Sequence, residues 1–414
     1  MVICMKIVQI NTVNKILSTG RISYELTEEL KQAGHEAYIA YSYGEKGGSG
    51  SYRIGNTAGK KLHALCSRIT GLQAYFSTLS TIRFIVWLKK IKPDVVHLHN
   101  LHSNFIHLNL LLTYLSKNKI ATVITLHDCW FFTGGCTHYS NNQCFQWQTG
   151  CKRCPNYENG MPSWFFDRSK KIWIDRKRQF ERMPALAVVG VSDWITGEAK
   201  KSYLSHAKKI TRIYNWVNLE VFHPTKEENL KAKLGLGDKF IILGVAAQWM
   251  KSKGIYDFIE LSKILPKDCI IVLVGKWDGK IPLPPGIRNF QHIHKSADLA
   301  RIYSMSDVLV SLSTEESFGM IVAEALACAT PAIVRSATAS PELIGDHCGY
   351  VSKNNSINNI FEDIMRVKEN TKSNYSPYCR RFAEKNFDMH CNIHQYCNLY
   401  EELLQQDKKD NTRN

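Results

Sequence analysis

Residues 307–331, with the sequence DVLVSLSTEESFGMIVAEALACATP, join a strand, a loop and a helix in one short segment. The apolar run 307–312 predicts a buried strand, and 319–328 predicts a helix that ends before Thr330-Pro331. The loop carries Glu316 and the helix carries Glu324. This order is typical of an α/β fold, in which such a loop lies at the carboxyl end of a parallel strand.

The loop and the start of that helix offer two kinds of binding group. The first helical N–H groups, around Phe318, Gly319 and Met320, lack partners within the helix, and such groups favour phosphate. The carboxylates of Glu316 and Glu324 can accept hydrogen bonds from sugar hydroxyls. Phosphate donors beside hydroxyl acceptors predict a nucleotide-sugar site, and the alternative is an ordinary solvated helix face.

Strands and helices alternate on both sides of this segment. Strands are expected at 6–11, 36–43, 94–99, 121–126, 240–247, 269–274 and 308–312, and helices at 23–33, 82–91, 255–265 and 299–304. The alternation predicts an α/β fold of two facing Rossmann-like doubly wound domains with a cleft between them. We place the domains at 1–218 and 219–414, and we expect the last helix to pack back on the first domain.

Length and composition limit the classes of protein. A chain of 414 residues is too long for a typical single domain, and its longest apolar runs are too short to span a membrane. The start at Met1 shows no signal-peptide pattern, so we expect a cytoplasmic protein whose 13 cysteines are reduced or bind metal. The net charge of +16 allows nucleic acid, an anionic membrane surface or acidic substrates as partners.

Four cysteines lie in one polar, irregular loop at 133–162, namely Cys136, Cys144, Cys151 and Cys154. The last two have the two-residue gap of a zinc knuckle. Because the loop shows few apolar residues for a core of its own, a structural zinc held by all four thiols would explain its order. Two disulfides or free thiols are the alternatives.

Two stretches, 60–92 and 164–178, combine basic and aromatic residues. Both suit the surface of an anionic membrane, where a lipid-linked substrate would lie. The alternative for both is an ordinary amphipathic helix on the protein surface.

The whole string 313–326 resembles the E-x7-E signature of the retaining glycosyltransferases of the GT-B type, family four. The resemblance continues in six other segments: 18–21, 34–36, 93–99, 125–128, 189–192 and 215–224. Residues 125–155, with their cysteines, look closest to bacterial enzymes that build surface polysaccharides.

The resemblance implies roles for residues that bind the donor. Lys253, followed by Gly254, would bind the diphosphate. Gly20 would lie in the glycine loop that these enzymes carry after the first strand, and it would let the backbone approach the diphosphate. Glu316 would hold the transferred hexose and Glu324 the ribose.

Two further implications concern the sugar and the charge at the diphosphate. Backbone N–H groups at Phe318 and Gly319 would serve the sugar or its phosphate, and His127 would lie close to the donor sugar. The chain departs from the family at Gln248, where an arginine is usual, and Lys251 or Arg21 could replace that charge. No Asp-x-Asp pair occurs in the sequence, so we expect no catalytic metal.

The function that follows is retaining transfer of a hexose from a UDP- or GDP-sugar to a glycan or lipid-linked glycan in polysaccharide biosynthesis. The enzyme would work in the cytoplasm, and one form of this hypothesis places it as a peripheral protein on the inner face of the membrane. Two other hypotheses are a nucleotide-sugar epimerase of the same fold and a basic zinc-knuckle protein that binds nucleic acid. The sequence shows no base-reading module, so nucleic acid is not expected as a partner.

Overall fold

The computed structural model describes residues 4–155, 163–226, 228–279, 281–291, 293 and 295–413. The end of the expected cysteine-rich loop, 156–162, lies outside the described residues. The chain forms two compact units. Unit 1 comprises Met1–Ile213 with Ile393–Asn414, and unit 2 comprises Tyr214–Asn392. The division thus falls slightly before the boundary expected at 218, and the chain's last segment groups with unit 1.

Unit 1 contains a seven-stranded sheet in which every neighbouring pair is parallel. Its strands are β1 (Lys6–Asn14), β2 (Glu36–Gly44), β3 (Ser51–Arg53), β4 (Val95–Leu98), β5 (Ala121–Leu126), β6 (Leu186–Gly190) and β7 (Lys209–Arg212). The order is β3-β2-β1-β4-β5-β6-β7. The chain therefore reverses its winding direction between β1 and β4, where open α/β sheets bind their ligands.

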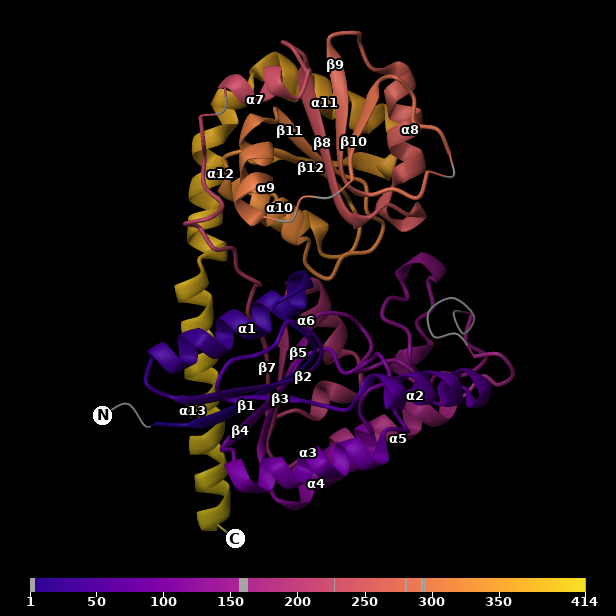
Figure 1. Cartoon of the computed structure of the whole chain (residues 1–414), viewed down its shortest axis with the longest axis vertical. Coiled ribbons are helices and arrows are strands. Elements are labelled where there is room, and N and C mark those ends of the chain that lie inside the picture. The colour runs from indigo at the N-terminus through magenta and orange to yellow at the C-terminus, as the bar shows by residue number, and fades with distance from the viewer. Residues whose placement is uncertain are drawn as a thin grey trace. The chain divides into compact units, whose positions relative to one another are not determined.

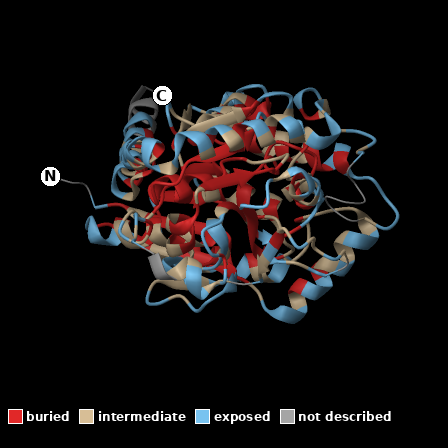
Figure 2. Ribbon diagram, turned by 90° about the horizontal axis from the view of Figure 1, so that it is seen from above, coloured by how far each residue is buried: buried red, intermediate tan, exposed pale blue. Residues whose placement is uncertain are grey.

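Helices flank this sheet (Figure 1). They are α1 (Leu17–Gln32), α2 (Thr57–Thr70), α3 (Thr78–Ile91), α4 (Leu108–Lys117), α5 (Ser169–Glu181), α6 (Asp193–Lys200) and, from Ile393 on, α13 (Met389–Arg413). In α1, Ile22, Leu26 and Leu30 recur at helical spacing and are fully buried. Buried residues follow the strands, and exposed residues follow the outer sides of the helices (Figure 2).

Unit 2 repeats the design with a six-stranded parallel sheet ordered β10-β9-β8-β11-β12-β13. Its strands are β8 (Phe240–Gln248), β9 (Cys269–Lys276), β10 (Ile287–Phe290), β11 (Val308–Ser311), β12 (Ala332–Arg335) and β13 (Gly349–Ser352). Its helices are α7 (Glu228–Lys233), α8 (Ile255–Ile264), α9 (Ser296–Met305), α10 (Met320–Ala327), α11 (Ile357–Asn370) and α12 (Lys372–Phe387). The expected class of two Rossmann-like doubly wound domains is confirmed.

Two local expectations were wrong. Gly20 does not lie in a loop after the first strand but in the first turn of α1, where its carbonyl accepts a hydrogen bond from the Lys15 N–H. The cysteine-rich loop does bury apolar groups, because Tyr139 and Trp147 are 3% and 1% exposed. Among the described helices, none has the length and apolar character needed to cross a membrane.

Candidate functional site

The loops after β8 and β11 bring two of the expected donor residues together in unit 2. Lys253 Nζ lies 2.6 Å from Glu316 Oε1 and donates to Ser313 Oγ at 3.3 Å. Both charged side chains keep access to solvent, with 35% and 19% of their surface exposed. Because β8 and β11 are the strands at the reversal of winding, this pair stands where the fold predicts a ligand.

Backbone contacts hold the two loops against each other. Thr314 N–H donates to the Ser252 carbonyl at 3.0 Å. Gly254 has φ +77°, and a Cβ there would come within 2.4 Å of the Leu312 Cβ. Only glycine fits this close approach, which explains why Gly254 follows Lys253 and why the lysine is brought to the β11 loop.

The start of α10 offers unpaired hydrogen-bonding groups beside that pair. Its N-cap is Gly319, with φ 103° and no side chain to cap the helix, so the first N–H groups stay available for a ligand. The hydroxyls of Thr314 and Ser317 are buried without a hydrogen-bond partner. The sequence interpretation did not identify these two hydroxyls, since Ser and Thr are common in loops. They add polar groups to the expected phosphate and sugar site.

Glu324 lies inside α10 and is only 5% exposed. It does not belong to a solvated helix face, because it accepts a hydrogen bond from the Tyr303 hydroxyl of α9 at 3.1 Å. A buried carboxylate needs hydrogen-bond donors, and the Tyr303 hydroxyl is one of them.

The two cations expected to replace the missing arginine belong to different units. Lys251 is exposed in the loop after β8, whereas Arg21 belongs to unit 1, where it pairs with Glu25 at 4.0 Å. A cation that the sequence did not point to is Arg335 at the end of β12, which is 8% exposed. It donates to the Leu312 carbonyl at 3.0 Å and so supports the β11 loop.

In unit 1, His127 is the partly buried end of a chain of hydrogen bonds. His127 Nε2 lies 3.0 Å from His99 Nδ1, and His99 Nε2 lies 2.8 Å from Gln9 Oε1. Burial lowers the pKa of His127 to about 4, although the neighbouring carboxylate of Asp128 opposes the shift. His127 is therefore neutral near pH 7, and its ring can exchange hydrogen bonds with hydroxyls.

The C-terminal helix completes this chain. Tyr400 of α13 lies 2.7 Å from His97 Nδ1 and accepts from Gln9 at 3.3 Å. Tyr396 contacts Thr125 Oγ1 at 3.0 Å, and His97 Nε2 contacts the same oxygen at 2.7 Å. The histidine cluster is thus a satisfied polar network that links α13 to β1, β4 and β5.

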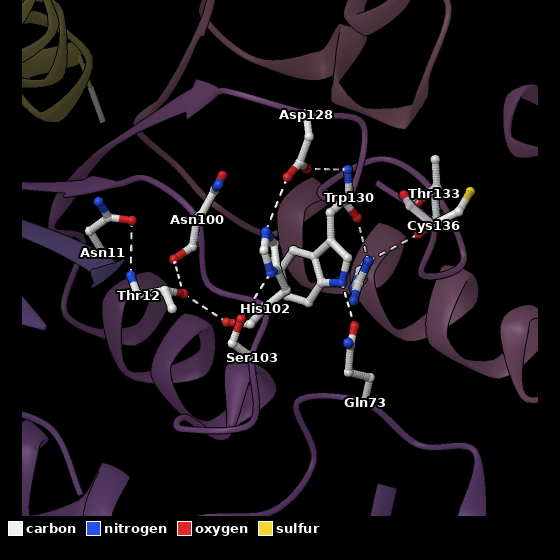
Figure 3. Close-up of polar contacts among 11 residues, drawn as sticks. Asn11, Thr12, Gln73, Asn100, His102, Ser103, Asp128, Trp130, Thr133 and Cys136 are labelled. Carbon is white, nitrogen blue, oxygen red and sulfur yellow. Dashed lines mark hydrogen bonds and ion pairs between the residues drawn. The ribbon is translucent and has the colours of Figure 1, made fainter. Parts of the chain in front are cut away.

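A second cluster follows the ends of β4 and β5 (Figure 3). His102 Nε2 lies 3.1 Å from Asp128 Oδ2, and the Trp130 N–H donates to Asp128 Oδ1 at 2.8 Å. Burial would raise the pKa of Asp128, but these hydrogen bonds and the nearby histidine outweigh it and lower that pKa. Asp128 is a buried anion whose position fixes the turn after His127.

The cysteine-rich loop begins directly after this turn. None of the four predicted thiols forms a disulfide, and all four line one pocket, together with Gly134, Gln146, Trp147 and Lys152. Within the described ranges, no three His, Cys, Asp or Glu side chains already surround a common point as metal ligands. The loop therefore gathers the predicted residues without showing a metal site.

Comparison with known proteins covers both units. A model described as "Glycosyltransferase Family 4" matches residues 19–221, and one described as "Glycosyl transferases group 1" matches residues 226–388. Among solved structures, sucrose-phosphate synthase from Thermosynechococcus elongatus aligns with 97% of this chain and 100% of its own, at TM-score 0.72 and 16% identity. That likeness supports the fold.

Three curated relatives match over parts of their length. N-acetyl-alpha-D-glucosaminyl L-malate synthase of Bacillus anthracis is 26% identical over 49% of this chain and 56% of its own. Alpha-monoglucosyldiacylglycerol synthase of Acholeplasma laidlawii is 26% identical over 64% of both. The O-antigen chain mannosyltransferase RfbU of Salmonella typhimurium is 28% identical over 40% of this chain and 46% of its own. The chain thus spans less than two thirds of the length of each of these relatives. The two family models together cover both of its units, and the chain belongs to the family-four glycosyltransferases of the GT-B fold.

Proposed function

We propose that this glycosyltransferase transfers a hexose, with retention of configuration, from a UDP- or GDP-sugar to a glycan or lipid-linked glycan. The observation that carries the proposal is the Lys253–Glu316 pair at the reversal of winding in unit 2. A lysine suits a diphosphate and a carboxylate suits sugar hydroxyls, so one donor molecule would engage both. The bound diphosphate would compete with Glu316 for the lysine and free the carboxylate for the hexose.

The leaving group needs stabilisation as the glycosidic C–O bond to the phosphate breaks. Lys253, the N–H groups at the start of α10 and the buried hydroxyls of Thr314 and Ser317 would supply hydrogen bonds and positive potential there. The acceptor oxygen would bond to the anomeric carbon on the same face, and its proton would pass to the departing phosphate oxygen. This route requires no protein side chain as general base.

His127 would serve the sugar as a neutral hydrogen-bonding group. Its pKa of about 4 keeps it uncharged at pH 7, so it would orient a hydroxyl rather than provide a charge. The network through His99 and Gln9 would hold its ring in place.

A membrane surface is the proposed location of the acceptor. In unit 1, apolar residues recur at helical spacing with their side chains exposed: Leu62, Leu65 and Ile69 on α2, and Leu79, Ile82 and Val86 on α3. Trp164 and Phe165 are 55% and 67% exposed, and the Trp164 N–H donates to the carbonyl of Arg68 at the end of α2. Exposed Lys61, Arg68, Lys89 and Lys90 lie on the same helices, and such a surface suits anionic lipid. One of the relatives is named for glycolipid synthesis, which agrees with this location.

The proposal also places the enzyme in the cytoplasm, peripheral to the inner face of the membrane. Flotation with vesicles would test this part. Binding to vesicles that contain anionic lipid, lost in a Leu62→Ser, Leu79→Ser double variant, is expected. Equal recovery of both proteins with neutral and anionic vesicles would contradict it.

The reaction itself is tested by incubating the purified chain with a panel of UDP- and GDP-hexoses. Release of UDP or GDP from one donor, faster when an acceptor glycan is present, is the expected result, and it should persist in EDTA. Interconversion of two sugars without nucleotide release would instead show an epimerase.

A further inference from the structure

The pocket in the cysteine-rich loop gathers four thiols that the proposed transfer reaction does not use. Cys136, Cys144, Cys151 and Cys154 come from separate points along the loop and line the same pocket. None of them forms a disulfide. Four thiols gathered in one place need a chemical reason, because the loop's aromatic groups already supply it with a small core.

Backbone contacts fix several of these cysteines. The Gly134 N–H donates to Cys151 Sγ at 3.1 Å, and the Thr133 hydroxyl donates to the Cys136 carbonyl at 2.7 Å. The Cys154 N–H donates to Asp167 Oδ2 at 2.7 Å. A backbone N–H aimed at sulfur stabilises a thiolate, as the groups that surround bound metals do.

A buried cation beside the pocket lacks an anion. Arg176 of α5 is 2% exposed and lies over the Trp130 ring at 3.7 Å. It donates to the carbonyls of Trp130 and Thr133, while its Nη2 is buried without a partner. No described carboxylate forms an ion pair with it. Burying a charge is costly without compensation, and Arg176 contacts Thr133, whose neighbour Gly134 donates to Cys151 Sγ.

We propose that these four cysteines bind one structural Zn²⁺ as thiolates. Four thiolates form a closed tetrahedral zinc site with no position open for catalysis. Zinc with four thiolates is an anion, and it would supply the negative charge that Arg176 lacks. The sulfurs do not yet surround a common point, so binding would draw them to about 2.3 Å from the metal and release their protons to solvent.

The site would also stabilise the turn that follows His127. Asp128 accepts a hydrogen bond from the Trp130 N–H. Arg176 donates to the carbonyls of Trp130 and of Thr133, and Thr133 lies close to the thiols in the sequence. Figure 3 shows Asp128, Trp130, Thr133 and Cys136 along this path. Loss of zinc should therefore loosen residues 133–155 and this turn while leaving unit 2 folded.

Elemental analysis of the full chain, purified under reducing conditions without chelator, tests the proposal. We expect about one zinc per chain. The Cys151→Ser and Cys154→Ser variants should lose most of the zinc. Cys66 is a partly exposed cysteine of α2 outside the pocket, so the Cys66→Ser variant should keep the zinc. A wild-type protein without zinc, or a Cys151→Ser protein with full zinc, would overturn the proposal.

Two measurements keep the proposal testable if Cys151→Ser does not fold. Replacing the metal of the wild-type protein with Co²⁺ should give the visible absorption of a tetrahedral thiolate site, and its absence would count against the proposal. Arg176→Met should weaken zinc binding by about 10- to 100-fold, whereas Arg176→Lys should not. Equal zinc affinity in these two variants would show that Arg176 is not the counter-charge.

Discussion

The two sheets share one winding order, yet the residues at their reversal points differ in kind. In unit 2 the loops after β8 and β11 carry the Lys253–Glu316 ion pair, partly open to solvent. In unit 1, β4, which borders the reversal, and the neighbouring β5 carry histidines that hydrogen-bond to one another and to Gln9 and Thr125. The same topology thus presents charge in one unit and neutral polar groups in the other.

This difference fits a division of labour. A diphosphate needs positive charge and free N–H groups, which unit 2 offers. A reacting sugar and its acceptor need directed hydrogen bonds with little charge, which a neutral histidine at the end of a hydrogen-bonded network would provide. The fold alone does not predict these proposed roles, since both sheets have the topology of nucleotide-binding domains.

The largest effect is expected from Glu316→Ala. Removing this carboxylate should lower transfer by roughly 100- to 1000-fold, because the hexose loses the group that orients it. Affinity for free UDP or GDP should stay the same or rise, since Lys253 loses its competing partner. Glu315→Ala, at the neighbouring carboxylate, is the matched control for activity and for titration calorimetry. A comparable loss of nucleotide affinity in Glu316→Ala would contradict the assignment of Glu316 to the sugar and not to the nucleotide.

A smaller effect is expected from Glu324→Ala. Nucleotide binding should weaken by roughly 1–3 kcal/mol, because ribose hydroxyls and the Tyr303 hydroxyl lose their acceptor. Glu324→Gln keeps an acceptor and should lose less. Calorimetry with the nucleotide and with its free base would show whether the loss depends on ribose. An unchanged affinity in Glu324→Ala would remove Glu324 from the nucleotide site.

The smallest effect concerns acid stability, and it should be confined to unit 1. The pKa of His127 falls from 6.5 to about 4 on folding, so the unfolded chain binds the proton more readily between these values. Stability from this group is complete above pH 6.5 and is lost as the pH falls towards 4. The pKa values of His97 and His99 are also lowered by burial and add in the same direction.

Hydrogen exchange of the β5 and β8 amides between these pH values would measure this contrast. Protection of β5 should fall more than that of β8, and His127→Asn should reduce the difference. Equal losses in the two strands would mean that the buried histidines do not distinguish the units.

Much of the fold could be predicted from the sequence because buried parallel strands are apolar runs between helical patterns. β5 was predicted with its observed bounds, Ala121–Leu126. The four-residue strand β12 was not predicted, although β4 and β11, which have the same length, were. Gly20 was misplaced because α1 starts at Leu17 and includes the glycine that was expected in a loop.

The donor side was easier to predict than the acceptor side for a physical reason. Lys253 and Glu316 lie in loops that follow strands, and the sequence order of such loops indicates that they meet. His127 contacts His99, His99 contacts Gln9, and Gln9 donates to Tyr400, which is far away along the chain. No local pattern predicts that the last helix contributes to this network. The buried hydroxyls of Thr314 and Ser317 could likewise be identified only from the structure.

The most direct test of the account is calorimetric binding of UDP and GDP to the wild-type chain, Lys253→Ala and Lys251→Ala. The account predicts that one of the two nucleotides binds the wild type. Lys253→Ala should weaken that binding about 10- to 100-fold, as expected for a lost charge-assisted contact worth roughly 1.5–3 kcal/mol. Lys251→Ala should change the affinity little. Binding of neither nucleotide, or equal affinity in wild type and Lys253→Ala, would contradict the claim that the unit 2 crevice holds the diphosphate of the donor.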